Sequence, residues 1–408
     1  MINYKLSFIE SPSEIEINLN SSKSESNRLL IIKSLSDNKI ELENLSHAND
    51  TVLLKNLIRS SSQNIWDAED AGTTMRFLTS FLAITKQGVL LTGTERMKKR
   101  PIKILVDALN KIGADISYTE KDGYPPIKIN RKISQIKESI SIRGDISSQY
   151  ISSLLMIAPV LPNGLKIDVM PPFYSKPYVM MTLNLMKKFG IKYDLSEDSI
   201  SINNQKYKSG SYKVESDWSA ASYWYSFISI NKKLKEIKLK GLREHSFQGD
   251  QVIEKIMTLF NVETLYDKDG IILRKKDFDC DYLELDFKDC PDLAQTVLVV
   301  AAFHKVKLKL YGVESLKIKE TDRLKAMSNE LKKIGVNFYD DNGVWTLDKR
   351  YNEFSNEASI ETYKDHRMAM AFAPLASEIN ITINNPDVVN KSYPSFWEDM
   401  KKAGYDII

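Results

Sequence analysis

Cysteine, histidine and long apolar runs are scarce in this chain, and each scarcity argues against a class of protein. The 408 residues include only two cysteines, Cys280 and Cys290, which form no CxxC pair and are too few for a disulfide framework. Four scattered histidines without an HExxH motif predict no metal site. The sequence has no run of about 18 apolar residues, so we expect no membrane span.

An excess of charge of one sign is also missing. The formal net charge is only +3, whereas proteins that bind the phosphate backbone of nucleic acids usually carry a concentrated excess of lysine and arginine. We therefore expect no nucleic-acid partner. The first residues carry charges and lack the apolar core of a signal peptide. Together with the low cysteine content, this favours a reducing compartment, and we expect a cytoplasmic protein.

The most informative feature that is present is an internal repeat. A small or polar opening followed by an apolar helical face begins near residues 22, 71, 147, 216, 290 and 365. Between these copies lie charged amphipathic helices such as TDRLKAMSNELKKIG, from Thr321. They end at a glycine, the expected C′ residue of a helix, or in one copy at Asn261.

Alternating runs typical of strands separate these helices, so six copies predict an α/β protein. The period of about 70 residues is too long for an ordinary solenoid, and three copies in each of two globular domains is the natural division. The first copy is the poorest match, and we expect it to have lost a strand. The alternative is a coincidental spacing of helices in an unrelated α/β protein.

Polar and cationic residues at the helix openings indicate anion binding. A helix N-terminus presents unpaired N–H groups and the positive end of its dipole. Such openings lie at residues 23–28, 72–76 and 147–149, the first two with lysine or arginine. Serine or threonine at a helix start is more often only a cap. Several openings with added cations nevertheless favour a site for an anionic ligand.

Charged residues also mark one loop and three further helix openings. The stretch 93–101, GTERMKKRP, carries four cations directly after an apolar strand, where loops often carry function; the alternative is a solvated face. Acidic and basic groups lead into helices at KIKETDRL, KDCPDLAQT and DHRMAM, where capping is the plain alternative. Because these groups recur at one position of the repeat, we expect a shared cleft between the halves to gather them.

Eight motifs together resemble the 5-enolpyruvylshikimate-3-phosphate synthase family of enolpyruvyl transferases: SKSESNR, AGTTMR, RMKKRPI, SSQY, SKPY, KETDRL, DHRMAM and NKSYP. Each is short, but their order and spacing from Lys23 to Lys391 make the joint match specific. The resemblance implies an α/β fold of two domains, each of three βαβαββ repeats in an inverse α/β barrel-like arrangement, with substrates in the interdomain cleft. The implied domains are residues 21–215 and residues 1–20 with 216–408, with a hinge near 20–22 and 214–216.

The resemblance implies an activity as well. Such an enzyme moves the enolpyruvyl group of phosphoenolpyruvate to the 5-hydroxyl of shikimate 3-phosphate by addition and elimination, in chorismate and aromatic amino acid biosynthesis. It implies two small-molecule substrates, no metal and no cofactor, and we expect a monomer.

Two alternatives to this activity stay open. The sister family that acts on UDP-N-acetylglucosamine shares the fold, but it usually carries a cysteine on a mobile loop where this chain reads GTERMKKRP. A non-catalytic anion-binding homologue is the second alternative.

Residue roles are also implied by the resemblance. Proton transfer would fall to Asp292, Glu320 and Lys23. The first domain would contribute most of the implied ligands of shikimate 3-phosphate, which are Ser24, Arg28, Ser147, Ser148, Gln149, Ser175, Tyr178, Asp292, Ser315 and Lys319. The implied ligands of phosphoenolpyruvate are Lys23, Gly72, Arg100, Gln149, Arg323, His366, Arg367 and Lys391. In the family, the glycine matched by Gly72 borders the pocket that the herbicide glyphosate also occupies.

The chain departs from the family's usual pattern at several of these motifs. Asp70 stands where asparagine is usual and adds a negative charge near the implied phosphoenolpyruvate pocket. Further departures are Thr74 for alanine, Phe77 for proline, Ser315 for a frequent asparagine, and Asn20-Ser21-Ser22 for Pro-Gly-Ser. We therefore expect substrate affinities that differ from the family norm.

Overall fold

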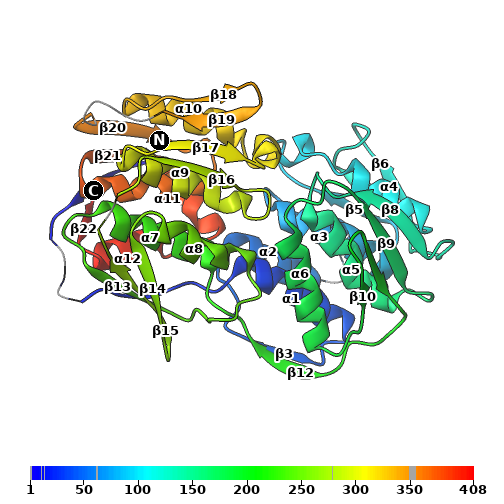
Figure 1. Cartoon of the computed structure of the whole chain (residues 1–408). Coiled ribbons are helices and arrows are strands. Elements are labelled where there is room, and N and C mark those ends of the chain that lie inside the picture. The colour runs from blue at the N-terminus through cyan, green and yellow to red at the C-terminus, as the bar shows by residue number, and fades with distance from the viewer. Residues whose placement is uncertain (1, 11, 13, 61–62, 278, 349–354) are drawn as a thin grey trace. The chain divides into compact units, whose positions relative to one another are not determined.

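The computed structural model describes residues 2–10, 12, 14–60, 63–277, 279–348 and 355–408, and the chain divides into two compact units. The discontinuous unit combines residues 1–21 with residues 215–408, and the continuous unit spans residues 22–214. Figure 1 labels many of the helices and strands of both units.

Within the described ranges, the continuous unit contains six α-helices, two four-stranded sheets and one two-stranded sheet. Its elements are α1 (Lys23–Leu35), β3 (Ile40–Glu43), α2 (Asn49–Arg59), β4 (Ile65–Asp67), α3 (Gly72–Thr85), β5 (Val89–Thr92), η1 (Met97–Lys99), α4 (Lys103–Lys111), β6 (Asp115–Tyr118), β7 (Ile127–Arg131), β8 (Ser139–Arg143), α5 (Ser148–Ile157), η2 (Ala158–Val160), β9 (Leu165–Met170), α6 (Lys176–Lys188), β10 (Asp194–Leu195), β11 (Ser199–Ile202) and β12 (Gly210–Lys213).

The discontinuous unit has the same alternation of helices and short strands. Its elements are β1 (Asn3–Phe8), β2 (Glu16–Asn18), α7 (Trp218–Ile230), β13 (Glu236–Lys240), η3 (Gly249–Val252), α8 (Ile253–Thr258), β14 (Val262–Asp267), β15 (Gly270–Lys275), β16 (Tyr282–Asp286), η4 (Pro291–Leu293), α9 (Ala294–Phe303), β17 (Lys307–Tyr311), η5 (Glu314–Ile318), α10 (Arg323–Lys333), β18 (Phe338–Asp341), β19 (Val344–Leu347), β20 (Glu357–Glu361), α11 (His366–Phe372), η6 (Ala373–Ser377), β21 (Asn380–Asn384), η7 (Pro386–Lys391), α12 (Phe396–Lys402) and β22 (Tyr405–Ile407).

Five sheets of the described residues share one strand order, which confirms the repeat. In the sheet β4-β5-β7-β6, for example, β4 and β5 run parallel, and the hairpin β6–β7 adds to β5 through an antiparallel pairing. The same order holds in β8-β9-β11-β10, β2-β13-β15-β14, β16-β17-β19-β18 and β20-β21-β1-β22. The first repeat was expected to lack a strand, and its sheet has two described strands, β3 and β12.

Strands from the start of the chain complete sheets built from its later part. β1 lies between β21 and β22, and β2 pairs with β13, so both belong to the discontinuous unit. Conversely, β12 pairs with β3 inside the continuous unit. An antiparallel bridge joins Ser21 to Ser216, where the chain leaves and re-enters the discontinuous unit.

Apolar helices contribute much of the core of each unit. In α9 every residue from Ala294 to Ala302 is buried, as expected for a helix that is hydrophobic all round. α7, α9 and α11 pack on one another in the discontinuous unit, and α3 packs on α5 in the continuous unit. Strands such as β13 alternate buried and accessible residues, so the sheets cover these helices with one face.

The amphipathic second helices end as the sequence predicts. Gly113, Gly190, Gly335 and Gly404 follow α4, α6, α10 and α12 with positive φ, and Asn261 follows α8 with φ of 66°. This left-handed conformation reverses the chain after the helix, which glycine and asparagine tolerate best.

Candidate functional site

A buried arginine organises a charged cluster in the discontinuous unit. Arg323 is only 2% exposed, and it opens α10. Its Nη1 lies 2.9 Å from Asp292 Oδ1, its Nη2 lies 2.9 Å from Glu320 Oε2, and its Nε lies 2.8 Å from Asp365 Oδ2. Three carboxylates therefore fix one guanidinium. Glu320 comes from the turn before α10, whereas Asp292 and Asp365 come from two other segments of the unit.

Helix capping explains why these groups converge. Asp322 caps α10 by accepting a hydrogen bond from Lys325 N at 3.1 Å. Asp365 caps α11 in the same way, accepting from Arg367 N at 2.9 Å. Since the helices that follow are largely buried, their polar first turns can hold these charges next to one another at the edge of the core.

Three further cations complete this charged cluster. Arg367 Nη2 lies 2.8 Å from Asp292 Oδ2, and Lys319 Nζ lies 3.9 Å from Asp292 Oδ1. Lys391 Nζ, at the end of η7, lies 3.7 Å from Glu320 Oε1. With Arg323, these four cations face the three carboxylates already described. The cluster thus has one more positive than negative side chain when all seven are ionised.

The cluster shifts the acidity of its members. Burial opposes ionisation of Asp292, but the charges of Arg367, Lys319 and Arg323 outweigh it and hold the pKa of this carboxyl far below its usual range. Burial lowers the pKa of Lys319, although Asp292 opposes that shift. At neutral pH, Asp292 is therefore a carboxylate that can accept a proton, and Lys319 gives up its proton more readily than an exposed lysine.

His366 and Ser315 lie next to these groups in the chain. His366 is buried at the first position of α11, and its Nδ1 lies 3.6 Å from Asp365 Oδ1. Ser315 is half-buried in η5, four residues before Lys319. Ion pairs or shared helix starts therefore bring together these predicted residues: Asp292, Lys319, Glu320, Arg323, His366, Arg367 and Lys391.

In the continuous unit, Arg28 is held by neutral oxygen atoms. It is 3% exposed, and its Nε donates to Thr182 Oγ1 at 2.6 Å. Its two terminal nitrogens donate to Ser24 O at 3.0 Å, Ser152 Oγ at 3.3 Å and Tyr178 O at 3.2 Å. These contacts tie α1 to α5 and α6, and burial lowers the pKa of Arg28 to about 10, so it stays a cation at neutral pH.

Two of the departures from the family pattern adjoin these helices. Phe77, in α3, lies beneath the guanidinium of Arg28, whose Cζ is 5.4 Å from the ring centroid; such cation–π contacts hold a guanidinium in place. Thr74 Oγ1 donates to Asp50 O at 3.1 Å. Asp50 in turn carries the carboxylate that lies 3.4 Å from Lys23 Nζ.

The openings of α3 and α5 lie side by side. Gln149 Nε2 donates to Thr73 Oγ1 at 3.0 Å, and Ser147 caps α5 by accepting from Gln149 N at 3.3 Å. Arg100 covers the start of α3 so closely that a Cβ added to Gly72 would lie 2.5 Å from Arg100 Nη1. Glycine at this position therefore leaves the room that the guanidinium occupies.

The remaining predicted residues of the continuous unit lie at the openings of α1, α5 and α6. Ser148 is the first residue of α5, and Ser175 precedes α6 in the left-handed conformation with φ of 56°. Both serines are buried, and Tyr178 lies in the first turn of α6. Lys23 and Ser24 open α1 behind the cap Ser22.

Sequence reasoning missed several residues of these clusters. Asp365 heads the motif DHRMAM, and its position before an apolar helix was a signal that could have found it. Asp50 and Thr182 gave no such signal, because they contact Lys23 and Arg28 from helices distant in the sequence.

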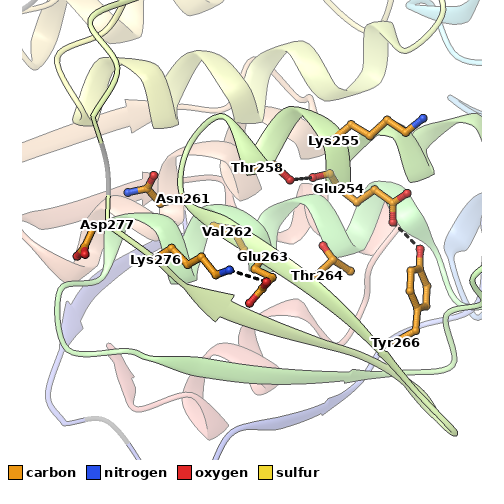
Figure 2. Close-up of a pocket in the computed structure, with 10 residues that line it drawn as sticks. All are labelled: Glu254, Lys255, Thr258, Asn261, Val262, Glu263, Thr264, Tyr266, Lys276 and Asp277. Atoms are coloured by element: carbon orange, nitrogen blue, oxygen red, sulfur yellow. Dashed lines mark hydrogen bonds and ion pairs between the residues drawn. The ribbon is translucent and has the colours of Figure 1, made fainter.

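A separate hollow of about 560 Å³ lies beside α8 and the β14–β15 hairpin (Figure 2). None of its lining residues belongs to the charged cluster around Arg323. Of the five charged side chains that line it, Lys276 Nζ contacts Glu263 Oε1, and Glu254 accepts a hydrogen bond from Tyr266 (Figure 2). With two lysines and three carboxylates, this lining has no excess of positive charge for binding a polyanion.

Among the described helices, none is both long and apolar enough to cross a membrane. The described residues also contain no group of three or more histidine, cysteine, aspartate or glutamate side chains arranged to hold a metal ion. Both cysteines are free thiols, and burial raises the pKa of Cys290 well above its usual range.

Comparisons with known proteins agree with the geometry. Residues 54–400 match the family model described as EPSP synthase (3-phosphoshikimate 1-carboxyvinyltransferase). A 3-phosphoshikimate 1-carboxyvinyltransferase of Bacteroides fragilis strain YCH46 is 45% identical over 405 residues, which cover 98% of both chains. The protein of the same name from Buchnera aphidicola subsp. Baizongia pistaciae is 37% identical over 94% of this chain and 95% of its own.

A solved structure gives the same fold. The EPSP synthase structure from Acinetobacter baumannii superposes with a TM-score of 0.77, covering 100% of this chain and 99% of that chain at 20% sequence identity. At this identity, the likeness concerns the arrangement of helices and strands.

Proposed function

Because the chain belongs to the EPSP synthase (3-phosphoshikimate 1-carboxyvinyltransferase) family, we propose that it transfers the enolpyruvyl group of phosphoenolpyruvate to the 5-hydroxyl of shikimate 3-phosphate. The observation that carries this proposal is the cluster in which Asp292 and Glu320 contact four cations. Two anionic substrates need fixed cations, and a reaction with two proton transfers needs carboxylates beside them.

The chemistry proceeds in two steps that need both kinds of group. In the addition, the 5-hydroxyl oxygen bonds to C2 of phosphoenolpyruvate, the hydroxyl proton leaves to a base, and C3 gains a proton to become a methyl group. In the elimination, the C2–O bond to phosphate breaks, C3 loses a proton, and the enol ether and phosphate are released. General acid–base catalysis typically contributes about 10²- to 10⁴-fold to such steps.

We assign to Asp292 the role of accepting the proton of the 5-hydroxyl. We assign proton transfer to and from C3 to Glu320 and Lys23. The low pKa of Asp292 keeps it ionised, and therefore able to act as a base, before the substrates bind. Anionic substrate groups that bind Arg367 and Lys319 would compensate the charges that now hold Asp292 ionised, so its pKa would rise and its basicity would increase. Glu320 contacts Arg323 and Lys391, which would keep its carboxyl oriented.

Shikimate 3-phosphate is the proposed ligand of the α1, α5 and α6 openings. Arg28 is already oriented by four hydrogen bonds, so it can present its charge to a phosphate or carboxylate without reorganising. The proposed ligands are Ser24, Arg28, Ser147, Ser148, Gln149, Ser175 and Tyr178 of the continuous unit, and Asp292, Ser315 and Lys319 of the discontinuous unit.

Phosphoenolpyruvate is the proposed ligand of the most cationic positions. Arginine suits its carboxylate and phosphate because the planar guanidinium donates two parallel hydrogen bonds. The proposed ligands are Lys23, Gly72, Arg100 and Gln149 of the continuous unit, and Arg323, His366, Arg367 and Lys391 of the discontinuous unit.

The positions of the two cysteines do not favour UDP-N-acetylglucosamine as the acceptor. Cys280 lies between β15 and β16, and Cys290 is buried next to η4. The loop 93–101 contains neither. The chain therefore lacks a loop thiol of the kind that the sister family usually carries.

The decisive experiment is a phosphate-release assay with phosphoenolpyruvate and each acceptor in turn. We expect release with shikimate 3-phosphate and none above background with UDP-N-acetylglucosamine or with no acceptor. Mass spectrometry of the first reaction should show the enol ether. Release only with UDP-N-acetylglucosamine would overturn the proposal, and a chain inactive with both acceptors would support the non-catalytic alternative.

A further inference from the structure

The segment that carries Arg100 is fixed immediately after that residue. Pro101 O accepts a hydrogen bond from the hydroxyl of Tyr150 at 2.5 Å, and Arg76 Nη2 lies 3.5 Å from the same oxygen. Tyr150 comes from α5 and Arg76 from α3. Two helices of the continuous unit therefore hold the carbonyl that follows Arg100 in the chain.

The same arginine also secures the segment before Arg100. Arg76 is 5% exposed, and its Nη1 donates to Gly72 O at 3.0 Å and contacts Met97 Sδ at 3.7 Å. Met97 is fully buried, and its carbonyl accepts from Arg100 N at 3.0 Å. The guanidinium of Arg76 thus connects the start of α3 to both sides of Arg100.

We propose that Tyr150 and Arg76 are positioning residues for phosphoenolpyruvate: they hold the 97–101 segment so that Arg100 stays over Gly72. This inference rests on the proposed function, in which Arg100 is a phosphoenolpyruvate ligand. The guanidinium of Arg100 lies so close to Gly72 that a Cβ at that position would be 2.5 Å from Nη1. A binding side chain that is displaced by about 1 Å loses much of its effect on the substrate. The contacts of Tyr150 and Arg76 with Pro101 O therefore govern how strongly Arg100 binds phosphoenolpyruvate.

Tyr150→Phe tests the anchor with the smallest possible change, since it removes one hydroxyl and keeps the buried ring. Loss of a hydrogen bond of this kind corresponds to about a 2- to 10-fold change in an equilibrium. We expect the KM for phosphoenolpyruvate to rise by that factor, while the KM for shikimate 3-phosphate changes by less than about twofold.

The chain offers a matched control. Tyr207 donates its hydroxyl to Met156 O at 2.8 Å in a buried position of the same unit. Tyr207→Phe therefore removes the same chemical group from the same kind of bond without touching the 97–101 segment. We expect it to lower the melting temperature about as much as Tyr150→Phe and to leave both KM values unchanged. Equal KM changes in the two variants would show that Tyr150 acts only through stability.

A double-mutant cycle connects the anchor to Arg100. In an Arg100→Lys background, the side chain can no longer donate two parallel hydrogen bonds from a planar group. The exact position of the 97–101 segment should then matter less for phosphoenolpyruvate binding. Tyr150→Phe should then raise the KM for phosphoenolpyruvate by a smaller factor than in the wild-type background. Arg76→Lys, if it folds by circular dichroism, should give the same selective KM change as Tyr150→Phe.

The outcomes separate this inference from the proposed function. A wild-type chain that releases no phosphate with shikimate 3-phosphate overturns both. An active wild type whose KM for phosphoenolpyruvate is unaltered by Tyr150→Phe, or a cycle in which the effects of Tyr150→Phe and Arg100→Lys multiply independently, overturns only the positioning role.

Discussion

The two units hold buried arginine in different ways. In the discontinuous unit, Arg323 is bound by three carboxylates, and the cations of the cluster hold the pKa of Asp292 far below its usual range. In the continuous unit, Arg28 donates to hydroxyl and carbonyl oxygens and lies over Phe77. When neutral groups hold a cation, its positive charge stays available to a ligand. When a cation contacts several carboxylates, its charge instead lowers their pKa values.

This contrast suggests that the two clusters serve different parts of the reaction. Variants of the discontinuous cluster should alter the chemical step, and variants around Arg28 should alter ligand binding with little effect on the chemical step. Each of the following changes tests one side of that comparison.

The largest effect should come from the carboxylates around Arg323. Asp292→Asn and Glu320→Gln keep the size of each side chain but remove its ability to take up a proton, so each should lower kcat by about 10²-fold or more. Steady-state kinetics of phosphate release measures this. Glu284→Gln, on an exposed strand, is the control and should leave kcat unchanged. A near-normal kcat in either cluster variant would remove that residue from proton transfer.

A smaller effect, on binding, should follow from Arg28→Met. Removing a charge-assisted hydrogen bond is worth about 1.5–3 kcal/mol, or roughly 10- to 100-fold in affinity. We expect the KM for shikimate 3-phosphate to rise by that factor, while the KM for phosphoenolpyruvate changes much less. Ser152→Ala, which removes one partner of Arg28 and keeps the cation, should have a weaker effect in the same direction. Equal rises in both KM values would contradict a ligand-specific role.

Gly72→Ala should have an intermediate effect confined to phosphoenolpyruvate. The new methyl group would lie 2.5 Å from Arg100 Nη1, so the guanidinium must move away. We expect the KM for phosphoenolpyruvate to rise by about 10-fold, glyphosate inhibition to weaken, and the KM for shikimate 3-phosphate to change little. Inhibition kinetics on both proteins, with thermal melts as a folding control, measures this. If both KM values rise and the melting temperature collapses, Gly72 is purely structural.

The smallest effect should come from Asp70→Asn. The Asp70 carboxylate accepts a hydrogen bond from Thr94, at the start of the loop that leads to Arg100. Asparagine can still accept that bond but lacks the negative charge of the half-buried Asp70 carboxylate, and that charge repels an anionic substrate. We expect the KM for phosphoenolpyruvate to fall by about twofold at low ionic strength and by less as salt screens the charge. A rise instead would show that the hydrogen bond, rather than the charge, matters.

Local features of the structure were accessible from the sequence, because they depend on residues a few positions apart. The openings at Lys23, Gly72 and Ser147 begin helices as predicted, and Gly113 and Asn261 end them. The almost wholly apolar run of α9 predicted a buried helix. The short first repeat was visible as an interval shorter than the others, and its sheet has two described strands.

Contacts between distant segments were not accessible in that way. Arg28 and Thr182 are 154 positions apart, and Arg323 and Asp365 are 42 apart. Nothing in the local pattern around Thr182 distinguishes a hydroxyl that orients an arginine from one that merely bonds its own helix. The resemblance to a family indicated which residues matter, whereas the partners that orient them required coordinates.

The strand exchange has a consequence for the order in which the chain can fold on the ribosome. β1 and β2 are synthesised first, yet their partners β13, β21 and β22 are among the later segments to emerge. All strands of the continuous unit, by contrast, are available once residue 214 has been made. We therefore expect that unit to become protease-resistant on stalled nascent chains before β1 and β2 have paired with their partner strands.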